Sequence, residues 1–428
     1  SEKLSERWST VSALEGERKY AAALKQVEAL AEQFRAEGLS QELVRAIVKT
    51  TNLKLMLGQH LGAIKYISNT EWPDDLFAYV VLSLLKGEAY SRYLSRHGWE
   101  IRQRERVDSK SELEVEKWTY HEINDASSDS FYRVWQHRAQ LDDIHDTPLR
   151  EYMEPGNYPR NIRGSLRDAV TYLWAKHLKN TGGWRPEQES SIYTISVDEV
   201  LGHSVPVVEM NDHEIHPIRR LAWLLTEHET WHRSQGREEA ALEAYLVRLR
   251  TLYGHFAQSG PGAAENRVQF ISALKARLAQ SKALPWWTVG MELMARWTID
   301  TGGSTSKADA ARIARTAIEK YADSVGARRC EFLLKKLTGP SLTVQAMGQD
   351  GPNRRSIGLN YRNITQVRFS AWKIDLAQKI LGTKGWQIGL DQNEAKEIRD
   401  DRDPDYEWSV DLVPTKDLNE HRHWVVPP

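Results

Sequence analysis

Apolar residues recur at steps of three and four along most of the first three quarters of the chain. The spacing is mostly helical from about residue 6 to residue 337, with a turn at Gly38. Side chains three and four positions apart lie on one face of an α-helix, so this spacing predicts amphipathic helices that pack in pairs. The clearest face consists of Leu24, Val27, Leu30, Ala31 and Phe34, followed by Leu43, Ile47 and Leu53.

A turn followed by an alanine-rich helix with bulky residues recurs at 16–30, 236–249 and 307–337. Small residues let helices approach closely, and bulky residues fill the groove between them. We therefore expect residues 1–338 to form an irregular array of helical hairpins of the tetratricopeptide type. Residues 182–208 mix Gly, Pro and Ser with a short β-like run at 191–197, which indicates an irregular surface insertion.

The period changes to two after Gly339 and Pro340. Alternation of apolar and polar residues is typical of half-buried strands, and short strands with turn signals favour an antiparallel β-sandwich. We expect such a sandwich, in truncated form, over residues 339–428. The predicted fold class is thus multi-domain α plus β, mainly α-helical. The alternating runs are 342–346, 357–361, 367–371 and 408–412, and residues 423–428 read as a strand entering a loop.

Length and charge limit the classes of function. A chain of 428 residues exceeds the usual size of one hydrophobic core, so at least two domains are expected. Its 58 basic and 59 acidic residues give a net charge of -1, which argues against a nucleic-acid partner. No apolar run is long enough for a membrane span. Ser1 opens directly on a charged, helix-like stretch, so we expect that an export signal, if one existed, has been removed.

Residues 317–375 have the most distinctive sequence of the chain. It resembles the N-terminal part of large bacterial alpha-2-macroglobulin-like proteins, in which a helical region precedes the first macroglobulin-like β-sandwich. Trp8 and the helices at 16–30 and 163–178 are similar to that helical region, and 417–421 is similar to the late part of such a sandwich. The segments that carry the likeness most strongly are 321–330, 333–334, 341–344, 361–364 and 367–375.

The resemblance implies an exported protein, periplasmic, in the outer envelope or secreted, that traps or blocks proteases. Members of the family can carry a thioester within a Cys-x-Glu-Gln motif. The single cysteine, Cys330, is followed by Glu331 and Phe332, so that motif is absent here. We therefore expect neither thioester chemistry nor a bait region in this chain, and any inhibitory action of a parent protein would depend on other parts.

The segment from His228 to His232 matches the zinc motif H-E-x-x-H, in which Glu229 would activate a zinc-bound water. The metzincin continuation is absent, because Gln235 and Glu238 stand where it needs Gly and His. Glu265 is the candidate third ligand of a gluzincin-type site. We interpret the segment instead as a partly exposed helix end whose Trp231 packs on the next hairpin, and expect no metal site; His228, Glu229 and His232 remain the candidates.

Two further groups of residues could either bind a ligand or have a purely structural role. His203, His213 and His216 lie in or near the expected insertion, and His213 with His216 could chelate a metal, although unligated loop histidines are more common. Trp286, Trp287 and Trp297 could form a carbohydrate platform, but tryptophans in helices more often fill grooves between them.

The sequence therefore predicts a protein without catalytic residues or cofactor: a recognition or scaffolding module from the N-terminal part of an exported alpha-2-macroglobulin-like protease inhibitor. Its partners would be another protein or further domains of the same polypeptide, and proteases would be targets of the full-length parent. The first alternative is a zinc metallohydrolase that uses His228, Glu229 and His232. The second is a module that binds carbohydrate or the cell envelope through surface tryptophans.

Overall fold

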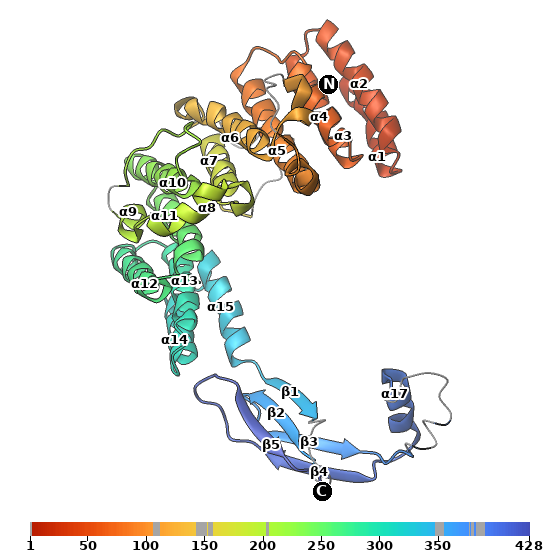
Figure 1. The fold of residues 1–428 in the computed structure, drawn as a ribbon, viewed down its shortest axis with the longest axis vertical. Coiled ribbons are helices and arrows are strands. Elements are labelled where there is room, and N and C mark those ends of the chain that lie inside the picture. Colours follow the sequence, from red (N-terminus) through yellow and green to blue (C-terminus); the bar gives the residue numbers. More distant parts are fainter. Residues whose placement is uncertain are drawn as a thin grey trace. The chain divides into compact units, whose positions relative to one another are not determined.

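The computed structural model describes residues 2–105, 112–142, 152, 157–202, 205–346, 355–375, 377, 381 and 390–428. The chain divides into two compact units, Ser1–Leu284 and Pro285–Pro428. The fold is mainly helical with small antiparallel sheets near the C-terminal end, as the change of period in the sequence predicts (Figure 1). Among the described residues, no helix combines the length and the apolar character that crossing a membrane requires.

The first unit consists of helices and short 3₁₀ turns. The helices are α1 (Glu2–Gly16), α2 (Tyr20–Ala36), α3 (Ser40–Met56), α4 (His60–Asn69), α5 (Leu76–Ile101), α6 (Tyr120–Gln136), α7 (Leu166–Leu178), α8 (Pro186–Ser191), α9 (Val197–Leu201), α10 (Pro217–Ser234), α11 (Glu238–Phe256) and α12 (Ala263–Gln280). The 3₁₀ turns are η1 (Glu112–Lys117), η2 (Arg138–Gln140), η4 (Thr181–Gly183) and η5 (Ile192–Thr194).

Helices that follow one another in the chain pack on one another, from α1 to α7 and then from α7 through α10 and α11 to α12. The predicted apolar face of α2 is buried throughout. Gly38, Gly58 and Gly236 end α2, α3 and α10 with positive φ angles of 69°, 76° and 68°. A residue with a side chain is strained in this left-handed conformation, so glycine allows the chain to reverse within two or three residues. The predicted helical pairs arise from these turns.

The prediction of a β-like run at 191–197 is wrong. These residues lie in the end of α8, in η5 and at the start of α9. The expected surface insertion also contributes to the interior, because it buries Trp184, Ile192 and Val200. The apolar side chains of this segment fall on the inner sides of short helical turns, a spacing that over so few residues also fits alternation.

The second unit begins with three helices and continues with strands. Its elements are α13 (Trp287–Asp300), α14 (Ser306–Lys320), α15 (Val325–Thr338), β1 (Ser341–Ala346), β2 (Ile357–Arg362), β3 (Gln366–Ala371), α17 (Gln392–Asp401), β4 (Tyr406–Asp411) and β5 (His421–Val425). One antiparallel sheet has the order β1-β2-β5, and β3 pairs with β4 in a second. Side chains from both sheets share one apolar core that includes Leu359, Val367 and Leu412. All the alternating runs of the sequence are strands.

The helix-to-strand change falls between Thr338 and Ser341, where the period of the sequence changes. The boundary between the compact units lies earlier, because α13, α14 and α15 pack on one another and Leu418 packs against their apolar cluster. Asn419 also donates a hydrogen bond to the carbonyl of Ser304 at 2.9 Å. The expected division at 338/339 thus follows element type, whereas the contacts group these three helices with the strands.

Candidate functional site

The H-E-x-x-H segment occupies the last two turns of α10. This helix starts with His216 as N-cap and Pro217 in its first turn, where a missing N–H costs no helical hydrogen bond. His228 and His232 are four residues apart and therefore project from the same face. Their side chains are 0% and 1% exposed, and Glu229 is buried as well. The expectation of a partly exposed helix end is wrong for all three.

Asp168 meets the two histidines from the first turn of α7. Ser165 caps this helix, and Ser165 and Asp168 form a reciprocal capping box. Oδ2 of Asp168 accepts hydrogen bonds from the backbone N–H groups of Gly164 and Ser165 at 3.0 and 2.9 Å, and from the Ser165 hydroxyl at 2.9 Å. These three donors fix the carboxylate and leave Oδ1 directed at α10.

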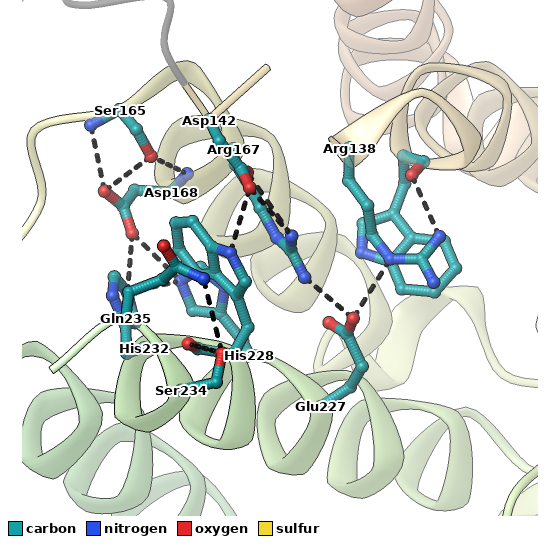
Figure 2. A network of polar contacts seen from close by, with 12 residues as sticks. Arg138, Asp142, Ser165, Arg167, Asp168, Glu227, His228, His232, Ser234 and Gln235 are labelled. Atoms are coloured by element: carbon teal, nitrogen blue, oxygen red, sulfur yellow. Dashed lines mark hydrogen bonds and ion pairs between the residues drawn. The ribbon is translucent and has the colours of Figure 1, made fainter. Parts of the chain in front are cut away.

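The three side chains converge at one point, as Figure 2 shows. Nε2 of His228 lies 3.0 Å from Oδ1 of Asp168, and Nε2 of His232 lies 2.9 Å from the same oxygen. The two Nε2 atoms are 3.2 Å apart. Each Nδ1 atom is buried without a hydrogen-bond partner among the described residues. Within the described part of the chain, Asp168 is therefore the only polar anchor that the two imidazoles share. We call these three residues the His-Asp cluster.

Burial and hydrogen bonding shift the pKa values of Asp168 and His228 in opposite directions. Burial alone would favour a protonated Asp168, but the hydrogen bonds and charges of His228 and His232 outweigh it and hold the pKa of Asp168 well below its usual range. Burial lowers the pKa of His228, and Asp168 only partly compensates. Within the cluster the histidines thus favour the ionised form of the Asp168 carboxyl, whereas burial favours the neutral form of the His228 imidazole.

Glu229 points into a different environment. Its carboxylate forms ion pairs with Arg233 at 2.6 Å, Arg248 at 3.4 Å and Arg277 at 3.3 Å. Three guanidinium groups thus engage this carboxylate away from the His-Asp cluster, so it is not placed to take a proton from a water bound there. The motif is therefore divided: its histidines face Asp168, and its glutamate faces an arginine cluster formed by α10, α11 and α12.

A second polar network joins α7 to α10 beside the His-Asp cluster (Figure 2). Arg167 is buried and forms ion pairs with Glu227 at 2.7 Å and with Asp142 at 3.3 Å. Asp142 also accepts a hydrogen bond from Nε1 of Trp231 at 3.0 Å, and the Arg167 guanidinium lies 4.1 Å from the centre of the Trp231 ring. Trp231 therefore anchors a charged network instead of packing only on the next hairpin.

Asp168 and His232 line a cavity of about 940 Å³. Most of its other lining residues come from the segment before α7 and from the α10–α11 turn with the start of α11, including Arg160, Ser165 and Arg237. The lining combines both signs of charge with backbone groups. The cluster is thus buried within the protein and adjoins a space that small molecules or water can occupy.

His213 and His216 do not form a shared site. His203 lies outside the described residues. Nε2 of His216 donates to the carbonyl of Gln188 at 2.9 Å, and Nδ1 accepts the Ile218 N–H at 3.0 Å, so both ring nitrogens serve the backbone. His213 lies between Asp125, at 3.3 Å, and Asp129, at 2.9 Å. No shared ligand point connects His213 with His216.

The remaining candidates also have structural positions. Trp286, Trp287 and Trp297 are all buried, which fits groove filling and not a carbohydrate platform. Glu265 is exposed in the first turn of α12. Cys330 is buried, and burial raises the pKa of its thiol to about 12, so it is not a reactive thiolate at neutral pH.

Sequence reasoning missed Asp168, which lies 60 residues before His228. The zinc-protease pattern places the third ligand downstream of the motif, whereas Asp168 lies upstream of it. One signal was available: Ser165-x-x-Asp168 precedes an apolar run and indicates a helix start with an oriented carboxylate. No family model, curated protein or solved structure matches the chain. The site is therefore interpreted from its own geometry.

Proposed function

We propose that the chain is a non-catalytic recognition and scaffolding module of an exported, bacterial alpha-2-macroglobulin-like protease inhibitor. The observation that carries the recognition role is the packing of neighbouring helices from α1 to α7 and then through α10 and α11 to α12 in the first unit. A protein in which each hairpin contacts mainly its neighbours exposes a large surface for its length, and this is how helical arrays bind other proteins. Family and export rest on the sequence resemblance over residues 317–375.

The surroundings of Glu229 support the non-catalytic part of the proposal. An H-E-x-x-H hydrolase needs this glutamate beside the metal-bound water, where it acts as general base. Here the carboxylate pairs with Arg233, Arg248 and Arg277. The zinc-hydrolase alternative would therefore require another base.

A peptidase assay separates the two functions. The full chain, supplied with zinc, is incubated with unfolded casein beside the variant Glu229→Gln. We expect no cleavage by either protein above a buffer control. Turnover by the wild type that disappears in Glu229→Gln would refute the non-catalytic assignment, provided that circular dichroism shows the variant to be folded.

Binding is tested with proteases whose active sites are covalently blocked, so that they cannot degrade the chain. A panel of serine and cysteine proteases is mixed with the full chain and analysed by sedimentation velocity. Inhibition would depend on other parts of the parent, but the helical surface would contribute to recognition. We therefore expect a complex with at least one member, and hydrogen exchange should then show protection along consecutive helices of the first unit. Absence of a complex with every protease would contradict protease recognition by this chain.

A further inference from the structure

Hydrogen bonding alone does not account well for the His-Asp cluster. If both rings carry their proton on Nε2, one oxygen accepts both N–H groups, but their hydrogens crowd each other because the two nitrogens are only 3.2 Å apart. If one ring carries its proton on Nδ1, the Nε2 lone pair of that ring faces the lone pairs of Oδ1, which is repulsive. A cation at the point of convergence removes both conflicts, because all three atoms then present lone pairs to it.

The separations of the three atoms agree with a metal-ligand set. Metal–ligand bonds of about 2.1 Å separate neighbouring ligand atoms by about 3.0 Å at right angles and by about 3.4 Å in a tetrahedron. The three distances in the cluster are 2.9, 3.0 and 3.2 Å. These separations match those of three ligands on one face of an octahedral site. For a tetrahedral site, the ligand atoms would have to move apart by a few tenths of an ångström.

We propose that Asp168, His228 and His232 bind one divalent first-row transition metal ion through Oδ1 and the two Nε2 atoms, with the remaining coordination positions open to the adjoining cavity. Two imidazoles and one carboxylate suit zinc, iron(II) or cobalt(II), whereas calcium and magnesium prefer oxygen ligands alone. The ion would join α7 to α10. This proposal is independent of the recognition function.

The groups around Asp168 support its role as a metal ligand. Ser165 and Gly164 hold its Oδ2 with three hydrogen bonds, as outer-sphere partners hold ligand carboxylates in metal sites. Aromatic contacts place the two rings. Tyr172 packs edge-on against His228 with 5.3 Å between the ring centres, and the ring centres of Trp231 and His232 are 4.4 Å apart. Their Nδ1 atoms have no partner among the described residues. We therefore expect weaker binding than at closed structural zinc sites, by about 10–100-fold for each missing partner.

Isothermal titration of the chelator-treated full chain with zinc chloride tests the proposal. We expect one ion per chain, and a loss of affinity of more than about 100-fold in His228→Gln and in His232→Gln. His213→Gln is the matched control, because His213 also contacts carboxylates but lies outside the cluster; it should bind zinc like the wild type. No stoichiometric binding by the wild type, or unchanged binding in both cluster variants, would overturn the site.

A measurement on the wild type protects the test against variants that misfold. Cobalt(II) is added to the full chain, and its visible spectrum and X-ray absorption fine structure are recorded. We expect imidazole scattering from two rings, with nitrogen and oxygen ligands at about 2.0–2.1 Å from the cobalt. An intense visible spectrum would identify a four-coordinate site, and a weak, shifted spectrum a six-coordinate site. The spectrum of hydrated cobalt without imidazole scattering would refute the proposal.

Discussion

The two faces at the C-terminal end of α10 are built from adjacent residues and differ in chemistry. On one face, His228 and His232 meet a single carboxylate oxygen of Asp168. On the other, Glu229 meets guanidinium groups from α10, α11 and α12. The first face gathers two imidazoles around one carboxylate oxygen, whereas the second holds a carboxylate that three guanidinium groups surround.

This difference shows what a short motif does and does not specify. Helical geometry ensures that residues four apart share a face and that their neighbour points elsewhere. It does not specify which helices pack on each face. In a zinc protease both faces serve one reaction, whereas here α7 faces the histidines, and α11 and α12 face the glutamate. Substitutions on the two faces should therefore have separable effects.

The largest effect on stability is expected for Glu229→Gln. The substitution leaves the buried guanidinium of Arg248 and the partly buried guanidinium of Arg277 without their shared counter-charge. Removing one partner from a buried ion pair typically destabilises a protein by about 3–5 kcal/mol. Urea unfolding followed by hydrogen exchange in peptides from α10 and α11 measures the change, and zinc affinity should stay within about threefold of the wild type.

Glu32→Gln is the control for this variant. Glu32 pairs with Arg35 three residues away on the surface of α2, and its side chain is 75% exposed. An exposed pair of this kind contributes about 0–1 kcal/mol. If both substitutions had equally small effects, the arginine cluster would not be the stabilising element on this face of α10.

The next largest effect on stability is expected at the histidine face, and only when metal is added. A ligand that binds the folded state alone stabilises it by about 2.7 kcal/mol at a concentration 100 times its dissociation constant. Zinc should therefore raise the urea midpoint of the wild type and leave that of His232→Gln unchanged. An equal rise in both proteins would place the bound zinc away from His232.

The sequence predicts the fold better than the site. Period-3.6 and period-2 spacing locates α2, α3 and all the alternating strands, because burial of one face imposes that spacing wherever an element is long. It fails at 191–197, where the turns are too short for the two periods to differ. The histidine pair follows from local spacing as well. Asp168 does not, because only tertiary packing brings α7 onto α10, and no local pattern encodes that contact.

A smaller effect is expected on acidification, through the N-terminus of α10. Burial lowers the pKa of His216 to about 4, from 6.5 in the unfolded chain, and its hydrogen bond to Gln188 only partly opposes this. The unfolded state therefore binds a proton that the folded state excludes. Stability should be complete above pH 6.5 and should fall as the pH is lowered toward 4. Protonation of Nδ1 also removes the acceptor for the Ile218 N–H.

His216→Asn tests this explanation, because asparagine caps helices well and does not titrate. Urea midpoints are measured for both proteins at pH 7.0, 5.5 and 4.5. The wild type should lose up to about 2 kcal/mol more than the variant over this range, the upper limit for a helix cap. Parallel curves would assign the acid sensitivity to other groups, such as His177, whose pKa burial also lowers to about 4.

The smallest effect is expected for Ser165→Ala, and it connects the fold to the histidine face. Loss of an N-cap hydroxyl costs about 1 kcal/mol. The same hydroxyl donates to Oδ2 of Asp168, so its removal leaves two backbone donors to orient the carboxylate. Loss of an outer-sphere partner lowers metal affinity by about 10-fold or more.

Ser165→Thr separates the two consequences, because threonine retains the hydroxyl and caps nearly as well. Zinc affinity from isothermal titration and stability in urea are measured for both variants. We expect Ser165→Thr to restore both quantities. If Ser165→Ala lost stability but bound zinc as tightly as the wild type, the two backbone donors would suffice to orient Asp168, and the capping box would serve only to start α7.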